Sequence, residues 1–170
     1  MYSKKNLVFL GMMGSGKSSI GFLVSKKLNL KFVDIDNVIE SETGMKISNI
    51  FETRGESYFR ELEEKITLKV LKATNIVVSL GGGGFINDKI RNQVLINHFS
   101  FWLNWDSEIL LTRIKNNKKR PVAHKSTNQE ITSLIKKRSK IYSKAKFKIN
   151  CNKLTKTEIV EKITKIYELN

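Results

Sequence analysis

The sequence has little cysteine, proline or histidine, and it has no long apolar run. Its 170 residues contain one cysteine, Cys151, and one proline, Pro121. A single cysteine excludes an internal disulfide framework and favours a reducing, cytoplasmic compartment. The apolar run Leu7–Leu10 is too short for a signal peptide, and no run approaches the roughly 20 residues that span a bilayer. His98 and His124 lack metal-ligand spacing, so we interpret both as surface or packing residues.

Negative charge is also scarce. The chain has 31 Lys and Arg against 16 Asp and Glu, a net charge of +15, and residues 115–170 hold 14 Lys and 2 Arg against 4 Glu. A basic segment of this kind can bind nucleic acid. However, most of the basic residues are lysines, and aromatic residues are not interleaved with them as a single-strand binding surface requires. We interpret the excess as solvated lysines on helix faces and expect no specific nucleic-acid partner.

The segment Gly11–Ser18 fits the pattern G-x-x-x-x-G-K-[ST]. The apolar run Leu7–Leu10 before it predicts a buried strand, and Ser19–Leu28 after it predicts an amphipathic helix. A glycine-rich turn between a strand and a helix directs backbone N–H groups at phosphate oxygens. Lys17 would reach the β- and γ-phosphates, and the Ser18 hydroxyl would bind Mg²⁺. A chance match is the alternative, but this context favours a nucleoside triphosphate site.

Strand-like apolar runs alternate with longer segments of helical periodicity. The predicted strands are Leu7–Leu10, Lys31–Asp34, Ile76–Leu80, Phe99–Leu103 and Phe147–Cys151. The helical segments between and after them include Ser57–Ala73, Asp106–Asn116, Gln129–Ser143 and Thr155–Leu169. This alternation predicts an α/β fold, a parallel sheet with helices on both faces. Ligands of such sheets bind at the carboxyl ends of the strands.

Two carboxylates follow the second predicted strand. Asp34 and Asp36 are two residues apart, which places both on one side of an extended chain. A phosphoryl-transfer enzyme needs one carboxylate near Mg²⁺ and another at the acceptor hydroxyl. The third predicted strand has no acidic end, so Asp34 is the candidate for the metal side. The alternative is that one aspartate only caps a helix beginning near Asn37.

Four glycines, Gly81–Gly84, follow the third predicted strand. They are costly in chain entropy and suit a loop that a ligand approaches closely, with backbone N–H groups left for its oxygens. A merely flexible loop is the alternative.

Only six arginines occur, and three have alternative interpretations. Arg60 lies three or four residues from Glu56, Glu63 and Glu64, so the residues alone favour a surface ladder of ion pairs on a helix. Arg138 lies in a basic helical segment, where it can be one more solvated charge. Arg120 lies in a polar stretch long enough to form a lid over the nucleotide.

Together these motifs resemble the shikimate kinase family in order and approximate spacing, over about residues 7–150. The motifs are the phosphate loop, Phe32-x-Asp34-x-Asp36, Gly55-Glu56-x-x-Phe59-Arg60-x-x-Glu63, Ser79-Leu80-Gly81-Gly82-Gly83, Arg120-Pro121 and Lys137-Arg138-x-x-x-Tyr142. The resemblance implies one kinase domain over residues 1–170, with a five-stranded parallel sheet of the nucleoside-monophosphate-kinase type. It implies an acceptor-binding segment at about 34–61 and a mobile lid at about 115–128. The implied reaction is ATP-dependent phosphorylation of the shikimate 3-hydroxyl by a monomer that requires Mg²⁺.

The resemblance also assigns roles to residues. ATP would contact Gly14, Ser15, Gly16, Lys17, Ser18, Ser19 and the lid residue Arg120. Shikimate would contact Asp36, Arg60, Gly81, Gly82, Gly83 and Arg138, with both arginines on its carboxylate, Asp36 on ring hydroxyls and the Gly82 N–H donating. The implied catalytic residues are Lys17, Asp36 and Arg120. Mg²⁺ would be held by Ser18 directly and by Asp34 through water.

The sequence departs from the family pattern in two places, and other functions stay open. Val122-Ala123 replaces the usual Leu-Leu of the lid, and the loop 152–157 lacks the usual proline and an adenine-side arginine. We therefore expect altered lid packing and assign no adenine contact there. The alternatives are a gluconate or nucleoside monophosphate kinase, a basic nucleic-acid-binding NTPase, or an inactive descendant. Intact candidate residues disfavour the last, namely Lys17, Ser18, Asp34, Asp36 and Arg120.

Overall fold

The computed structural model describes residues 5–116 and 126–170. They contain a five-stranded sheet in the order β2-β3-β1-β4-β5, in which every neighbouring pair is parallel. The strands are β1 Leu7–Leu10, β2 Lys31–Asp34, β3 Ile76–Ser79, β4 Phe99–Asn104 and β5 Phe147–Asn150. The predicted α/β fold with a five-stranded parallel sheet is confirmed, and each strand differs from its prediction by at most one residue at its carboxyl end.

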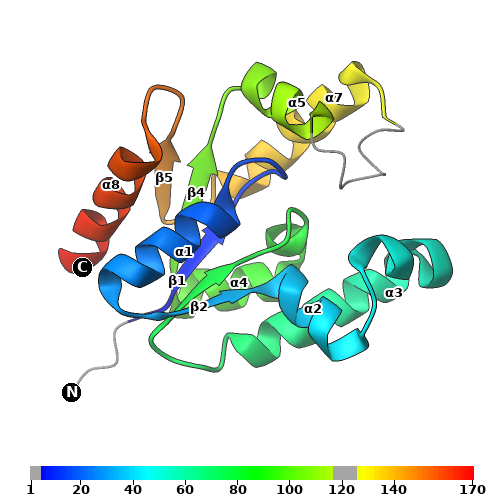
Figure 1. The fold of residues 1–170 in the computed structure, drawn as a ribbon, viewed down its shortest axis with the longest axis horizontal. Coiled ribbons are helices and arrows are strands. Elements are labelled where there is room, and N and C mark those ends of the chain that lie inside the picture. Colours follow the sequence, from blue (N-terminus) through cyan, green and yellow to red (C-terminus); the bar gives the residue numbers. More distant parts are fainter. Residues whose placement is uncertain (1–4, 117–125) are drawn as a thin grey trace.

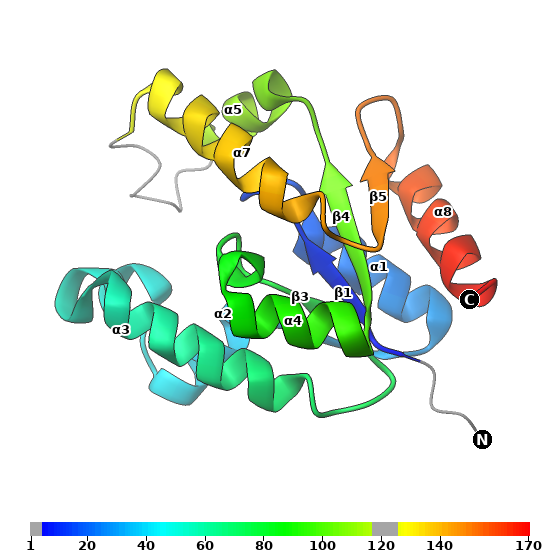
Figure 2. The same cartoon turned by 180° about the vertical axis from the view of Figure 1, so that it is seen from behind.

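Helices cover both faces of the sheet. They are α1 Lys17–Leu28, α2 Ile35–Thr43, α3 Ile47–Val70, α4 Asp88–Asn97, α5 Ser107–Lys115, α7 Asn128–Tyr142 and α8 Lys156–Glu168, with a 3₁₀ turn η1 at Gly84–Ile86. Helices α1 and α8 lie on one face (Figure 1) and α4 lies on the other (Figure 2). Helix α5 lies beyond the tip of β4, and α7 runs from the level of α5 back alongside β4 (Figure 2). None of the helices in the described segments is both long and apolar enough to cross a membrane.

The central strand β1 is apolar throughout because both of its faces are buried. Val8 and Leu10 pack in the core on one side of the sheet, and Leu7 and Phe9 pack in the core on the other. This alternation follows from the two-residue period of a strand. A strand covered by helices on both faces therefore has an unbroken apolar run, which is why β1 could be predicted from the sequence.

The long helix α3 begins earlier than the predicted Ser57–Ala73. It runs from Ile47 to Val70 and is interrupted at Gly55, which has φ 83° and ψ 170°. Glycine adopts this positive φ without the steric cost that other residues incur. The break separates a short amino-terminal arm from the rest of the helix. The prediction was wrong at the amino-terminal end, because helical backbone already begins at Ile47, before the break at Gly55, and resumes after it.

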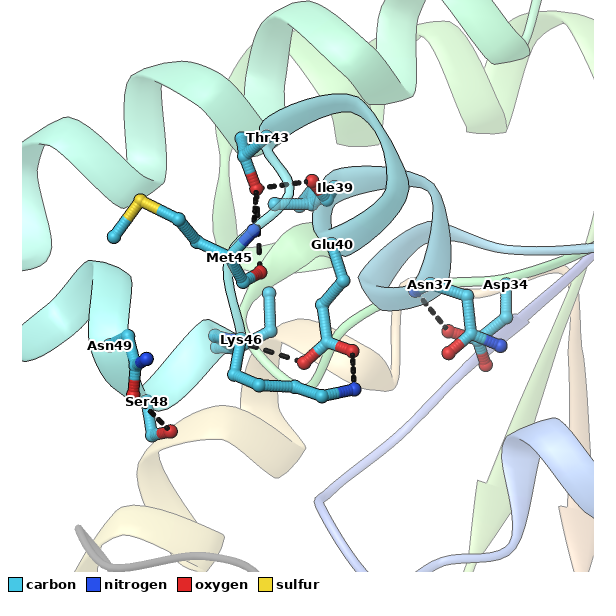
Figure 3. A network of polar contacts seen from close by, with 10 residues as sticks. Asp34, Asn37, Ile39, Glu40, Thr43, Met45, Lys46, Ser48 and Asn49 are labelled. Carbon is cyan, nitrogen blue, oxygen red and sulfur yellow. Dashed lines mark hydrogen bonds and ion pairs between the residues drawn. The ribbon is translucent and has the colours of Figure 1, made fainter.

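A local hydrogen-bond network holds the beginning of α3 against α2. The Glu40 carboxylate accepts from the Ile47 N–H over 3.0 Å and from the Lys46 ammonium over 2.7 Å (Figure 3). The hydrogen bond from Lys46, followed by that from Ile47, lowers the pKa of Glu40 below its usual range. A carboxylate at a helix amino terminus satisfies an otherwise unpaired N–H and interacts favourably with the helix dipole. The network fixes how α3 leaves the α2 turn.

His98 is a buried packing residue between α4 and β4. It is 7% exposed, and neither ring nitrogen has a hydrogen-bond partner within residues 5–116 and 126–170. Burial, followed by the nearby Lys5 charge, lowers the pKa of His98. No group of three or more His, Cys, Asp or Glu in the described part of the chain could hold a metal ion.

Helices α5 and α7 flank the segment expected to form a lid. α5 ends at Lys115 and α7 begins at Asn128. Residues 117–125, with Arg120, Pro121, Val122, Ala123 and His124, lie outside the described residues. The lid at about 115–128 and its altered packing therefore stay predictions.

Candidate active site

The phosphate loop joins β1 to α1 in the geometry that its motif predicts. Gly14 and Gly16 have φ values of 79° and 87°, and Gly16 is the residue that precedes the helix. The helix begins at Lys17, two residues before the predicted start. Lys17 is buried, and its ammonium donates to the carbonyl oxygens of Gly11 and Met12 over 2.9 and 3.0 Å. The lysine thus lies along the loop that it would serve, at the positive end of the helix dipole.

Two side chains that sequence reasoning missed hold the loop from the β4 side. The Trp105 indole N–H donates to the Ser15 carbonyl over 2.9 Å, and an Arg113 N–H donates to the Gly14 carbonyl over 3.4 Å. The Arg113 guanidinium lies 3.8 Å from the centre of the Trp105 ring, a cation–π contact. Trp105 follows β4 and Arg113 lies on α5, about 90 to 100 residues beyond the loop. Such long-range contacts leave no local sequence signal.

Ser18 and Asp34 form an oxygen-rich group beside the phosphate loop. The Ser18 hydroxyl donates to Asp34 Oδ2 over 2.5 Å. The Ser79 hydroxyl, at the end of β3, lies 3.4 Å from the Ser18 hydroxyl. Hydroxyl and carboxylate oxygens are ligands that suit Mg²⁺. The structure therefore brings together the two residues that we assigned to the metal side.

The prediction that Asp34 and Asp36 lie on one side of an extended chain was wrong. β2 ends at Asp34, and Asp36 already lies in the first turn of α2. Asp34 accepts from the Asn37 N–H over 3.3 Å, so the capping role and the Ser18 contact belong to the same aspartate. The turn into a helix redirects Asp36 away from the Ser18 group, because helical and extended chains place residues two apart differently.

Asp36 meets Glu63 of α3 at the first glycine of the loop after β3. A side-chain Cβ at Gly81 would lie 2.6 Å from Glu63 Oε1 and 2.9 Å from Asp36 Oδ1. A side chain at position 81 would therefore displace one or both of these carboxylates. Glu63 is 2% exposed, and its Oε1 has no hydrogen-bond partner in the described part of the chain. Burial raises the pKa of Glu63 above its usual value, against the opposing effect of Arg60.

Arg60 faces the same loop from α3. It donates to Glu63 over 2.7 Å and to Glu56 over 3.2 Å, and its Cζ lies only 2.7 Å from where a Cβ at Gly83 would be. Arg60 therefore pairs with two glutamates of the expected ladder, and of these two only Glu56 is exposed. Glu64 pairs with Lys89 instead. The Arg60 side chain is 34% exposed, and its guanidinium lies against the glycine loop at Gly83.

The middle glycine of the loop connects α7 to the phosphate loop. The Gly82 carbonyl accepts from Arg138 over 3.4 Å and from the Tyr142 hydroxyl over 2.5 Å. A Cβ at Gly82 would lie 3.4 Å from the Met13 nitrogen. Arg60, Arg138 and Asp36 thus converge on one short loop that touches the phosphate loop. A phosphate donor and a small anionic acceptor can meet at this place.

Comparison with known proteins identifies the family. The sequence model of the shikimate kinases matches residues 13–168. The chain belongs to the shikimate kinase family. A shikimate kinase from Sulfurihydrogenibium sp. (strain YO3AOP1) is 44% identical over 163 residues, 95% of this chain and 98% of that protein.

Solved shikimate kinases also share the fold of this family member. The enzyme from Aquifex aeolicus vf5 is 34% identical, with a TM-score of 0.86 over 96% of both chains. The enzyme from Acinetobacter baumannii, solved in complex with shikimate, is 28% identical, with a TM-score of 0.90 over 98% of this chain and 94% of that one. The expected family and fold are confirmed. As a kinase of this family, the protein uses ATP as co-substrate.

Proposed function

We propose that this shikimate kinase family member transfers the γ-phosphoryl group of ATP to the 3-hydroxyl of shikimate, giving shikimate 3-phosphate and ADP. The observation that carries the proposal is the convergence of Asp36, Arg60 and Arg138 on the glycine loop beside the phosphate loop. Two arginines and a carboxylate fit a small ring that carries one carboxylate and several hydroxyls. The family match counts against the gluconate and nucleoside monophosphate alternatives.

On the donor side, the phosphate loop would bind the ATP phosphates. Its N–H groups and the α1 dipole attract anionic oxygens, and Lys17 adds a full positive charge close by. The ATP-binding residues in this proposal are Gly14, Ser15, Gly16, Lys17, Ser18, Ser19 and the lid residue Arg120. Arg120 would add charge to the transferring phosphoryl group, because such transfer is accelerated chiefly by positioning and charge neutralisation.

The residues beside the loop fit a bound Mg²⁺. Ser18 would hold it directly and Asp34 through water, and their hydrogen bond already brings the two oxygens together. When bound, the ion neutralises negative charge on the β- and γ-phosphates. Asp34 also caps α2, which fixes the position of its carboxylate.

On the acceptor side, Arg60 and Arg138 would each present a planar fork to the shikimate carboxylate. Glu63 holds one edge of Arg60 over 2.7 Å, so the guanidinium is oriented before the substrate arrives. Gly81, Gly82 and Gly83 would offer backbone N–H groups, with the Gly82 N–H as the main donor. Asp36 would bind the ring hydroxyls, orient the 3-hydroxyl and accept its proton as the O–P bond forms.

The segment 115–128 would close over the nucleotide and exclude water, which competes as acceptor. The protein would work as a monomer, since the donor and acceptor residues described above all lie on one chain. It would work in the cytoplasm, where ATP and reduced cysteine prevail.

A coupled ADP-release assay tests the proposal. The purified protein is offered shikimate, quinate, gluconate and nucleoside monophosphates in turn, with Asp36→Asn as the matched inactive control. We expect strong Mg²⁺-dependent turnover with shikimate alone. Turnover with another acceptor instead of shikimate would refute the assignment. Tight, salt-resistant binding of nucleic acid, or ATP hydrolysis that nucleic acid stimulates, would favour the nucleic-acid-binding NTPase instead.

A further inference from the structure

A buried tyrosine holds the glycine loop from the α7 side, and none of the roles proposed above uses it. Tyr142 is the last residue of α7 and is 1% exposed. Its hydroxyl donates to the Gly82 carbonyl over 2.5 Å, at the short end of the range for O–H···O bonds. Its ring packs against Trp102 of β4, with ring centres 6.1 Å apart. The side chain thus connects the sheet, α7 and the loop.

Tyr142 shares its acceptor with a proposed substrate-binding arginine. Arg138 lies one helical turn before Tyr142 and reaches the Gly82 carbonyl over 3.4 Å. That length marks a weak contact compared with the 2.5 Å bond of the tyrosine. If Arg138 turns toward a ligand carboxylate, the carbonyl keeps its stronger partner. The tyrosine therefore lets the arginine move without leaving this partly buried acceptor unpaired.

The same bond fixes the direction of the next backbone N–H. The peptide between Gly82 and Gly83 is trans, so its C=O and N–H point in opposite directions. Because the carbonyl points at α7, the Gly83 N–H points away from α7. Within residues 5–116 and 126–170, the N–H groups of Gly82 and Gly83 have no protein acceptor. Both are thus donors that a bound ligand can use.

We propose that Tyr142 is a positioning residue of the acceptor site: its hydroxyl fixes the Gly82–Gly83 peptide, which lets Arg138 turn to the shikimate carboxylate and holds the Gly83 N–H as a donor on the side of the loop away from α7. This inference rests on the acceptor site proposed above. It does not require Tyr142 to touch the substrate. Burial raises the pKa of Tyr142 to about 12, so the hydroxyl keeps its proton and stays a donor at neutral pH.

Tyr142→Phe removes the hydroxyl and keeps the ring that packs against Trp102. We expect kcat/KM for shikimate to fall by roughly ten-fold, mainly through a higher KM, with the KM for ATP little changed. Tyr167→Phe is the matched control, since Tyr167 is also buried but lies on α8, against Phe99 on the opposite side of the sheet. It should leave both KM values unchanged. Thermal unfolding of each variant shows whether stability has changed.

A double-mutant cycle separates positioning from general loss of structure. If Tyr142 acts through Arg138, then Tyr142→Phe combined with Arg138→Lys should lose less than the product of the two single effects. A parent-like KM for shikimate in Tyr142→Phe overturns the inference. So does an equal loss toward ATP and shikimate with a lower melting temperature. A large effect of Arg138→Lys with none of Tyr142→Phe refutes only the role of the tyrosine. If Arg138→Lys leaves the KM for shikimate unchanged, the proposed acceptor site is wrong and the inference falls with it.

Discussion

Replacing Arg60 by lysine tests the acceptor pocket, because the two interpretations of this residue predict different magnitudes. Arg60 pairs with buried Glu63 over 2.7 Å and with exposed Glu56 over 3.2 Å. If it served only a surface ladder, Lys would cost about 0.3–0.5 kcal/mol of stability and leave activity unchanged. If its guanidinium also grips the shikimate carboxylate, Lys cannot reproduce two parallel N–H···O bonds.

The expected loss follows from the contacts. A hydrogen bond to a charged group contributes about 1.5–3 kcal/mol, which corresponds to roughly a ten- to hundred-fold fall in kcat/KM for shikimate. The KM for ATP should change little. Removing one partner of a buried ion pair costs about 3–5 kcal/mol of stability. Lys keeps the charge beside Glu63 and Arg60 is partly exposed, so we expect a loss of about 1 kcal/mol.

Coupled ADP release at saturating ATP measures the activity, and urea unfolding measures the stability. Glu56→Gln is the matched control, because it removes the exposed end of the same ladder, 68% exposed, and should leave kcat/KM unchanged. A shikimate analogue with an amide in place of the carboxylate should be a poor substrate of the parent enzyme and hardly worse with Arg60→Lys. Parent-like kinetics of Arg60→Lys on shikimate would show that the acceptor pocket is wrong.

Three other variants test the remaining parts of the account. Lys17→Ala should abolish phosphoryl transfer in a folded protein, since backbone amides cannot replace its charge. Near-normal turnover with an unchanged circular dichroism spectrum would refute the assignment of the nucleotide site. Asp36→Asn should cut kcat severely and leave ATP affinity, measured by calorimetry, almost unchanged; a loss of ATP affinity with intact kcat would place Asp36 on the metal side. His98 has a lowered pKa, so the folded state binds fewer protons than the unfolded state, and the parent should lose stability as the pH falls below the ordinary value of 6.5. Unfolding of His98→Leu at pH 7 and pH 5 should show a smaller loss than the parent, and equal losses would contradict this.

The fold was predictable because its signals are local. Buried parallel strands such as Leu7–Leu10 are continuous apolar runs, and they alternate with segments of helical periodicity. The ends of helices and strands were predicted less well where the backbone changes conformation abruptly, as at Gly55 and between β2 and α2. α3 was predicted to begin ten residues too late, because helical backbone lies on both sides of the break at Gly55. Asp36 was placed on an extended chain although the predicted strand ends at Asp34, because the sequence did not show that α2 begins at Ile35, directly after the strand.

The site was predictable in part. Lys17 and Ser18 lie in one contiguous motif, so their geometry follows from a few neighbouring residues. Trp105 and Tyr142 act on loops about 90 and 60 residues away, and only the fold brings them there. Arg60 was ambiguous because its ladder partners look alike in sequence. The structure separates them by burial, since Glu63 is 2% exposed and Glu56 is 68% exposed.

The product formed from ATP and shikimate by the parent protein tests the central claim most directly. Proton-coupled ³¹P nuclear magnetic resonance of the reaction mixture identifies the carbon whose proton couples to the new phosphate ester. The account predicts one phosphomonoester, coupled to the proton at carbon 3 of shikimate, formed in equal amount with ADP. Inorganic phosphate in place of an ester, or an ester at another hydroxyl, would contradict it.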